Sequence, residues 1–183
     1  MQNKPAAKRI IAILLLLLVI FGGVNLFWYG FKYLPYKRMA AQMQRSDDSG
    51  RPRYADTDGD YLFHLKMPGY LSFQSGYLYI VEKDYEDAAA FVADENGNLT
   101  EKNIPHVDMF IWPQMFSQTE CRVTIYEETD SVWVMTNNRG EFIPDETLSA
   151  AENDRLSALF EEHESEIQEM INAAVAFWGD GLN

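Results

Sequence analysis

Residues 10–29 read IIAILLLLLVIFGGVNLFWY, with no charged side chain and a single strongly polar one, Asn25. A helix of about 20 residues at ~1.5 Å per residue spans ~30 Å, which matches the hydrocarbon thickness of a bilayer. Because lipid offers the backbone no hydrogen-bonding partner, a segment that crosses it must be helical. The stretch therefore predicts a transmembrane anchor helix over residues 10–34, with the lipid bilayer contacted through residues 10–29.

The flanks of this stretch favour an uncleaved signal-anchor over a cleaved signal peptide. The apolar core of a signal peptide runs about 7–15 residues and ends at a small-x-small site. Here the run is longer and ends in Phe27, Trp28 and Tyr29, aromatic residues typical of a membrane interface. Basic residues before and after the run nearly balance, so both orientations stay open. Lys8 and Arg9 directly abut the run, which favours a cytoplasmic tail (residues 1–9) and an extracytoplasmic C-terminal domain in the cell membrane.

Charge divides the chain into two parts. Residues 1–53 hold nine Lys and Arg against two Asp, a formal charge of +7, whereas residues 54–183 hold six Lys and Arg against 26 Asp and Glu, a charge of −20. We interpret residues 35–53 as a basic juxtamembrane stem and linker, and residues 54–183 as one acidic domain large enough for a single core. An acidic surface repels nucleic acid and favours a basic protein partner, and the alternative interpretation is a solvated surface that keeps the domain soluble.

The acidic domain contains several short runs in which apolar and polar residues alternate, as in half-buried strands. These runs are residues 61–66, 70–74, 77–82, 106–112, 121–127 and 131–136. Residues 83–93 differ and are expected to form a short helix. Ser149 and Glu152 form a capping-box pattern, after which apolar residues recur at steps of three and four as far as Trp178. We expect an α+β domain, with an antiparallel sheet of about five to six strands packed against a long C-terminal amphipathic helix.

One local pattern suggests a metal ion. Asp56, Asp58 and Asp60 alternate with other residues, as the oxygen ligands do at the start of a calcium loop. The pattern lasts five residues only, because the glycine and glutamate that an EF-hand requires further on are absent. A calcium turn is one interpretation, and a polar turn that leads into the first strand is the alternative.

No catalytic motif stands out. The Walker A, G-x-S-x-G, H-E-x-x-H and dinucleotide-binding patterns are missing from the sequence. His163 and Glu166 have the spacing of a metal-ligand pair, but also that of a packing contact within one helix. Cys121 has no second cysteine with which to form a disulfide, and it would need a cationic neighbour to act as a nucleophile. We therefore expect a non-enzymatic protein without a cofactor, and an unrecognised enzyme is an alternative.

Aromatic side chains at alternating strand positions are the candidates for partner binding. They are Tyr61, Tyr77, Tyr79, Tyr126 and Trp133. If the long helix covers one face of the sheet, the other face is expected to present these rings among carboxylates, a mixture that suits a protein interface. Burial of that face by a second helix at residues 83–93 is the alternative.

The leading hypothesis is a membrane-anchored domain that binds a protein partner. Two versions fit the sequence: an accessory subunit of an envelope assembly, and an immunity protein that blocks a surface-acting toxin. The acidic charge motivates the second version, because negative surfaces capture basic partners. A ligand- or calcium-binding extracytoplasmic sensor is the rival class.

Overall fold

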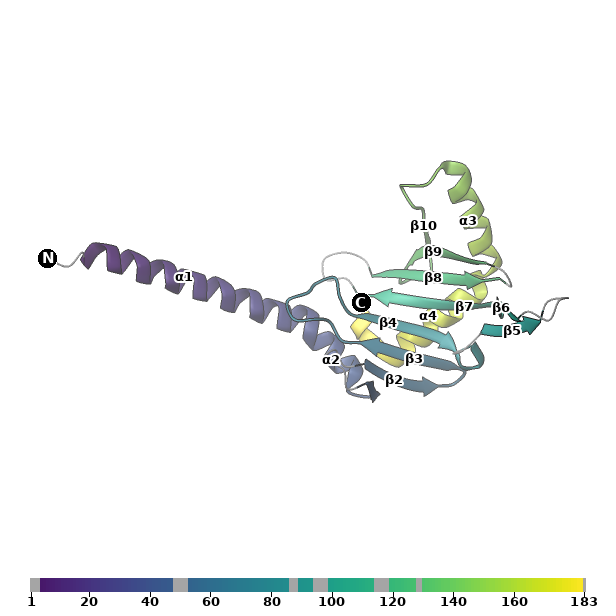
Figure 1. The fold of residues 1–183 in the computed structure, drawn as a ribbon, viewed down its shortest axis with the longest axis horizontal. Coiled ribbons are helices and arrows are strands. Elements are labelled where there is room, and N and C mark those ends of the chain that lie inside the picture. The colour runs from purple at the N-terminus through teal and green to yellow at the C-terminus, as the bar shows by residue number, and fades with distance from the viewer. Residues whose placement is uncertain are drawn as a thin grey trace.

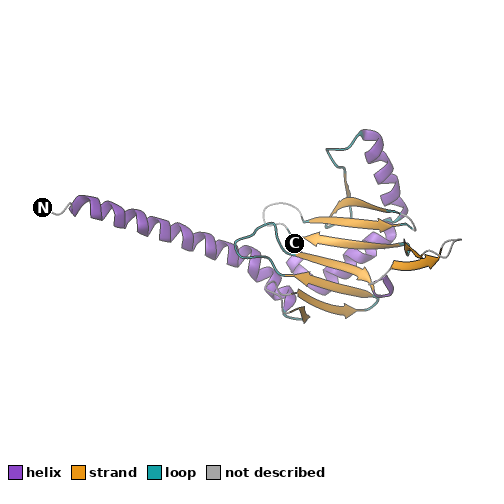
Figure 2. Ribbon diagram, viewed as in Figure 1, coloured by secondary structure: helices purple, strands orange, loops and turns teal. Residues whose placement is uncertain are grey.

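A long N-terminal helix projects from a domain that consists of one large sheet with helices on one side (Figure 1). The computed structural model of the chain describes residues 4–47, 53–85, 89–93, 99–113, 119–127 and 130–182. Helices and antiparallel strands occupy separate layers, so the architecture is α+β, as the sequence predicted (Figure 2).

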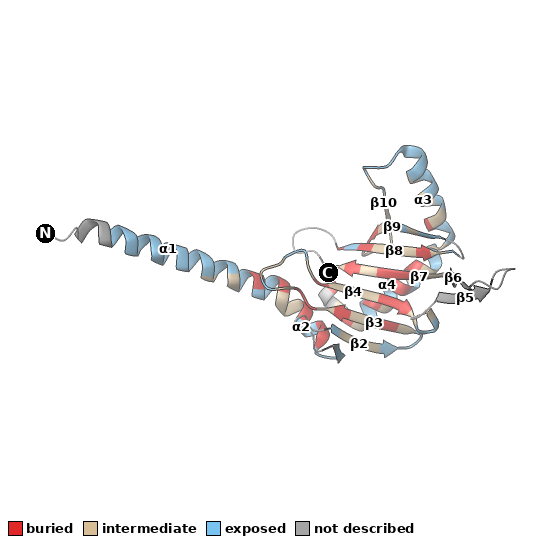
Figure 3. Cartoon of the chain, viewed as in Figure 1, coloured by how far each residue is buried: buried red, intermediate tan, exposed pale blue. Residues whose placement is uncertain are grey.

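The N-terminal helix runs without a break into the domain. Helix α1 (Lys4–Trp28) is followed by a π-turn (Tyr29–Tyr33) and by helix α2 (Leu34–Ala40). The Leu34 N–H donates to the carbonyl of Tyr29, five residues back, just before Pro35, whose nitrogen cannot donate. The helix is long and apolar enough to cross a membrane. Figure 3 shows α1 exposed along most of its length and residues buried where it enters the domain.

The main sheet is antiparallel, with the strand order β1-β2-β3-β4-β7-β8-β9-β10. Its strands are β1 (Gln44–Asp47), β2 (Arg53–Asp58), β3 (Tyr61–Lys66), β4 (Tyr77–Glu82), β7 (His106–Trp112), β8 (Glu120–Tyr126), β9 (Ser131–Asn137) and β10 (Phe142–Ile143). Between β4 and β7 the chain forms a separate two-stranded sheet from β5 (Ala89–Ala93) and β6 (Leu99–Asn103). The predicted strands at residues 61–66, 77–82, 106–112, 121–127 and 131–136 are confirmed within a residue or so.

Strand number and two local elements were predicted wrongly. The sheet has eight strands rather than five or six, because β1, β2 and β10 join the five confirmed strands. Strands β1 and β2 form from residues assigned to the linker and the polar turn. Strand β1 is a polar edge strand with no alternating pattern; residues 48–52 of the predicted linker lie outside the described residues. Residues 83–85 form a 3-10 turn and Ala89–Ala93 a strand instead of a helix, because pairing with β6 overrides the helix preference of alanine.

Residues 70–74 are not a strand either. They lie in the loop of residues 67–76 that joins β3 to β4, where Leu71 has a φ of 54°, outside the extended region. The β3–β4 hairpin is therefore closed by this long loop rather than by a tight turn at Ser75 and Gly76.

The C-terminal helix is two helices, not one. Helix α3 (Ala150–Glu162) and helix α4 (Glu164–Trp178) meet at His163, whose φ and ψ of −105° and 9° are not helical, and a 3-10 turn (Gly179–Leu182) follows. The predicted capping box is present, since the Glu152 N–H donates to Ser149 Oγ and the Ser149 N–H to the Glu152 carboxylate. The break lets α3 turn toward β10, where Phe160 and Phe142 have ring centroids 5.8 Å apart.

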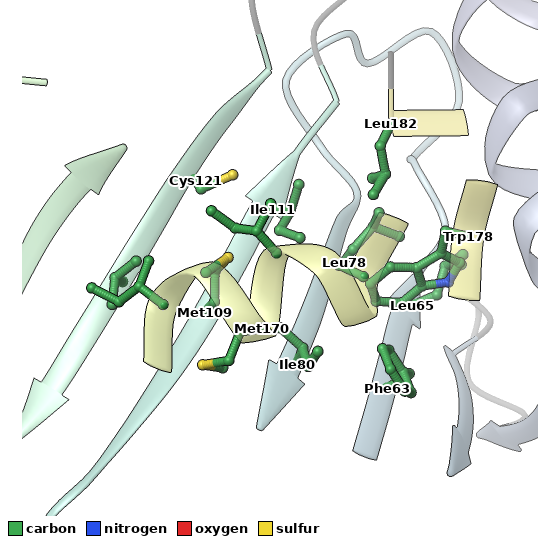
Figure 4. Close-up of a cluster of buried hydrophobic side chains, with 14 of the residues drawn as sticks. Phe63, Leu65, Leu78, Ile80, Met109, Ile111, Cys121, Met170, Trp178 and Leu182 are labelled. Carbon is green, nitrogen blue, oxygen red and sulfur yellow. The ribbon is translucent and has the colours of Figure 1, made fainter. Parts of the chain in front are cut away.

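The core lies between α4 and one face of the sheet (Figure 4). Cross-strand pairing aligns Phe63, Ile80, Met109, Val123 and Val134 in a row across five strands, and each is at most 1% exposed. Helix α4 lays its own buried residues on this row, among them Ile167, Met170 and Trp178. Helix α2 and the residues after it add Tyr36, Met39, Ala40 and Met43 to the same core. The segment that joins helix α1 to the sheet is therefore part of the domain.

Candidate interaction surface

The second face of the sheet, here called the open face, carries the side chains that alternate with the core row. Its central residues are His64, Lys66, Tyr77, Tyr79, Phe110, Trp112, Arg122, Tyr126, Trp133 and Met135. All of them are half-buried or exposed, whereas one further row of the same face, Leu62, Val81 and Asp108, is buried. Helix α4 lies behind the sheet in Figure 2, on the side away from these residues.

Aromatic rings and cations form a connected array on the open face. The ring of Phe110 lies 5.3 Å from that of Tyr77 and 4.6 Å from that of Tyr79. The Arg122 guanidinium lies over Phe110 at 5.1 Å and over Trp112 at 5.4 Å, and the Lys66 ammonium lies over Tyr77 at 5.4 Å. Such contacts contribute roughly 0.5–2 kcal/mol each and hold both groups in place. The array is therefore pre-organised on a rigid support.

A groove of about 210 Å³ opens at the β2–β4 end of this face. It is lined by Arg53, Tyr54, His64, Leu65, Lys66, Tyr77, Tyr79 and Phe110. Apolar rings form its walls, and two cationic side chains stand at its margin. Such a mixture binds an apolar side chain that has a carboxylate or carbonyl nearby.

A buried carboxylate, that of Asp108, accepts hydrogen bonds from two tyrosines of the open face. Asp108 is 3% exposed, and its Oδ2 accepts hydrogen bonds from the hydroxyls of Tyr79 at 3.1 Å and Tyr126 at 3.3 Å. Its Oδ1 has no hydrogen-bond partner among the described residues. Burial raises the pKa of the Asp108 carboxyl, and hydrogen bonds from Thr124, Tyr79 and Tyr126 partly offset this rise. The carboxylate thus fixes the orientation of two tyrosines on the open face.

Next to this carboxylate, three rings form a stack. The imidazole of His106 lies between the rings of Tyr85 and Tyr126, with centroids 5.2 Å and 4.3 Å away and planes within 12° and 1° of parallel. The stack connects the end of β4 to β7 and β8. It extends the ordered aromatic surface toward the margin of the sheet.

At the other side of the sheet, part of strand β9 has an unpaired edge. Strand β10 pairs only with Thr136 and Met135, so within the described residues Ser131–Val134 has no strand on its outer side. A groove of about 260 Å³ runs beside this edge, lined by β9 together with Phe142, Ile143, Asp145, Leu148 and Leu156. Trp133 is 51% exposed here, an unusually large exposure for a tryptophan. An unpaired edge beside an apolar groove can accept a further strand.

Charge is distributed differently from the sequence expectation. The aromatic residues stand among cations, with Arg53, Lys66 and Arg122 on the open face against the buried Asp108 and the peripheral Glu120. Helices α3 and α4 instead hold seven Asp and Glu against one Arg. In the described part of the chain, the acidic surface is therefore the helical side, and the aromatic surface is not carboxylate-rich.

Tyr61 is the predicted partner-binding residue that does not belong to the open face. It pairs with Asp58 and Glu82 on the core side, together with Phe63. Burial, followed by the carboxylates of Glu82 and the α4 residues Glu169 and Glu166, raises its pKa. The other four predicted residues, Tyr77, Tyr79, Tyr126 and Trp133, share the open face.

The three aspartates of the calcium pattern belong to a hairpin. Asp56 and Asp58 are in β2, and Asp60 is in the turn to β3, so this turn follows a strand rather than leading into the first one. Gly59 provides a positive φ of 57°, and its carbonyl accepts from Lys83 Nζ at 2.6 Å. Among the described residues, no three His, Cys, Asp or Glu side chains are arranged to hold a metal ion. The alternating aspartates are thus residues of a β-hairpin and its turn.

Cys121 and His163, the residues considered for catalysis or metal binding, lie in the core and at a helix boundary. Cys121 is buried on the core face, and burial raises its thiol pKa to about 12, so the nucleophilic thiolate does not form at neutral pH. His163 is at the break between α3 and α4, where its Nδ1 lies 3.2 Å from Glu166 Oε2.

Sequence reasoning missed Arg53, Lys66, Phe110, Trp112 and Arg122 as surface residues. The signal was present in part, because Phe110 and Trp112 alternate with the buried Met109 and Ile111. Their gathering around one arginine depends on cross-strand register, which the alternation does not give. Comparison of the chain with protein-family models, curated proteins and solved structures found no match. Function is therefore inferred from the chemistry of this surface.

Proposed function

We propose that this is a single-pass membrane protein whose C-terminal domain binds another protein through the open face of its sheet, without catalysis. The observation that carries the proposal is the array of Lys66, Tyr77, Phe110, Trp112 and Arg122 on the face opposite α4. Tyrosine, tryptophan and arginine dominate the binding energy of protein interfaces. They are the residue types gathered here.

Pre-organisation strengthens this proposal. Binding costs roughly 0.5–1.5 kcal/mol for each mobile side chain that it immobilises. Here the Phe110 ring contacts Tyr77, Tyr79 and Arg122 before any partner arrives, and Asp108 already holds Tyr79 and Tyr126. The face is thus built to lose little entropy on association.

The size of the open face suits a moderate interface. Six neighbouring strands, β2 to β9, contribute to it. With strands ~4.8 Å apart and about six residues long at ~3.3 Å each, the projected area is roughly 500 Å². A stable complex buries about 800 Å² per partner. The β9 edge and its groove supply further area, and Trp133 belongs to both surfaces.

The charge of the open face favours an acidic site on the partner. The Arg122 side chain is half-buried, with its guanidinium over Phe110 and Trp112, and a carboxylate of the partner would pair with its charge. Arg53 and Lys66 line the groove at the β2–β4 end of this face. Association should therefore weaken as salt rises.

A second candidate is binding of a basic protein on the helical side, and the seven carboxylates of α3 and α4 favour it. An immunity protein that captures a basic toxin would use this side, whereas an accessory subunit docked through rigid aromatics would use the open face. In both versions we propose that the domain faces outward from the cell membrane.

Site-specific cross-linking separates the two surfaces. A photoreactive amino acid is placed at Tyr77 or Trp133 on the open face, or at Glu161 on α3, in the full chain in its own membrane. Tyr77 and Trp133 are expected to yield the same cross-linked protein, and Glu161 none. Cross-links from Glu161 alone would instead favour the helical side.

Affinity measurements with the cross-linked partner, purified, complete the test. Arg122→Gln is expected to weaken binding at least about tenfold, the effect of losing ~1.4 kcal/mol. Arg155→Gln on α3 is the matched control and should leave affinity unchanged. Equal effects of the two substitutions, or none from either, would contradict use of the open face.

A further inference from the structure

The loop of residues 67–76 between β3 and β4 packs on the end of helix α1. The Trp28 indole donates a hydrogen bond of 3.3 Å to the Ser72 carbonyl, and its ring meets that of Tyr70 edge-on with centroids 5.4 Å apart. The rings of Phe27 and Phe73 lie 6.2 Å apart. The Tyr70 hydroxyl also donates to Oδ1 of Asn25. A segment of the folded domain thus reaches back along the anchor.

Aromatic side chains around this contact remain exposed. Tyr70 is 66% exposed and Phe73 39%, although both touch α1. On the helix itself, Tyr29 and Phe31 are 44% and 60% exposed. Two separate segments therefore present exposed rings at one level of the anchor. Tyrosine and tryptophan concentrate at the membrane–water interface in just such belts.

Helix geometry gives the depth of this level. Arg9 is the last charged residue before the apolar run. At ~1.5 Å per residue, a hydrocarbon layer of ~30 Å ends about 20 residues later, close to Tyr29. Asn25, Phe27 and Trp28 lie within the last turn or so before that limit. The side chains of the loop that contact them must then lie at the same depth.

The loop has a defined shape that holds these side chains in place. The Ser72 N–H donates to the Gly69 carbonyl at 3.0 Å, the Gly69 N–H to Ser75 Oγ at 2.7 Å, and the Ser75 N–H to Ser72 Oγ at 3.1 Å. The hydrogen bond from the Tyr70 hydroxyl also satisfies Asn25, the one strongly polar side chain of the anchor. The Asn25 Nδ2 in turn donates to the Phe21 carbonyl at 2.8 Å. A polar group in lipid is costly unless it is paired.

We infer that the loop of residues 67–76 inserts Tyr70 and Phe73 into the interfacial layer of the membrane that α1 crosses. The ligand is the lipid surface itself, and the inference rests on the membrane span assumed in the proposed function. The domain then has two lipid contacts, the anchor and the loop, so its tilt on the membrane is fixed rather than free.

Depth-dependent quenching of a fluorescent label tests this insertion in vesicles that contain no protein other than this chain, so no protein partner contributes. The full chain is labelled with the fluorophore NBD at Phe73→Cys and reconstituted into phosphatidylcholine vesicles of three kinds, with no bromine, with acyl chains brominated near the headgroup, and with acyl chains brominated near the bilayer centre, the depth of position 18. Leu18→Cys in the anchor is the positive control, and Asp60→Cys, at the opposite end of strand β3, is the negative control. The chain without an added cysteine is the blank, and it is expected to take up no label because its own Cys121 is 1% exposed.

Brominated lipid is expected to reduce NBD emission at positions 18 and 73 and to leave position 60 unchanged. Tyr70→Cys provides a second loop position, and the melting temperature of each variant confirms that it is folded. Quenching at position 18 alone would overturn loop insertion while leaving the anchor and the open-face proposal intact. Absence of quenching at position 18 as well would overturn the membrane span and loop insertion together.

Discussion

Trp28 at the end of helix α1 and Ser72 in the loop between β3 and β4 are 44 residues apart in sequence and are joined by a hydrogen bond of 3.3 Å from the indole nitrogen to the carbonyl oxygen. A second link lies further along the chain, where the Trp178 indole donates to the Met43 sulfur at 3.5 Å. The anchor and the domain are thus connected through packed side chains as well as through the chain itself. The consequence is a domain boundary well before residue 54.

A fragment that begins at residue 54 is expected to be far less stable than one that begins at residue 34. The shorter fragment lacks Tyr36, Met39 and Met43, which are 1%, 3% and 8% exposed, and it lacks β1. Burial of each large apolar side chain contributes roughly 1.5–3 kcal/mol, against a total stability of about 5–15 kcal/mol. Thermal unfolding followed by circular dichroism compares the two. Equal melting temperatures would show that α2 is dispensable.

Truncation of two neighbouring residues of β9 should lower the free energy of unfolding by very different amounts. Val134 is 1% exposed on the core face, and Val134→Ala is expected to lower the free energy of unfolding by about 2 kcal/mol. Trp133 is 51% exposed on the other face, and Trp133→Ala is expected to change stability by at most about 0.5 kcal/mol. Urea denaturation measures both. A large loss of stability for Trp133→Ala would indicate that the ring packs on the domain and is not available to a binding partner.

Asp108→Asn is expected to raise the melting temperature at pH 7.5. The pKa of Asp108 in the folded state lies above its usual 3.8, so the folded state binds the proton more tightly than the unfolded state does. Its favourable contribution is complete below pH 3.8 and is lost as pH rises through the raised value. The melting-temperature advantage of the variant should therefore shrink as pH falls from 7.5 to 4. An advantage that stays constant over this range would contradict a buried, titrating carboxyl.

Two glycines with positive φ form a matched pair. Gly59 has a φ of 57° and open space around it, so Gly59→Ala should cost only the backbone strain, about 1–2 kcal/mol. Gly76 has a φ of 89°, and an added Cβ would lie 3.0 Å from the Pro68 nitrogen and 3.1 Å from Tyr36 Cε1. Gly76→Ala should therefore cost clearly more, because it also pushes the loop of residues 67–76 from α2. Chemical denaturation of both variants checks the order, and equal losses would contradict the close contact.

The candidate surface was only partly predictable. The alternating pattern of β3 groups Tyr61 with the buried Phe63 and Leu65, and His64 with Lys66, so the misplacement of Tyr61 could have been avoided from that strand alone. The contact of Arg122 with Phe110 and Trp112 could not be predicted, because it depends on which residues of β7 and β8 stand opposite each other. Likewise, the net charge of −20 over residues 54–183 does not reveal that Lys66 and Arg122 stand among the aromatic rings of the open face.

The sequence by itself determined the elements whose periodicity is strong: the apolar helix of residues 10–29, the strands at Tyr61–Lys66, Tyr77–Glu82 and His106–Trp112, and the capped start of α3. Local burial patterns and caps are encoded within a few residues, so they can be found without a fold. Tertiary structure alone decided that polar residues 44–47 form an edge strand, that the helix breaks at His163, and that the loop of residues 67–76 lies against the anchor. These features arise from contacts between segments far apart in the chain, where pairing and packing outweigh local preference.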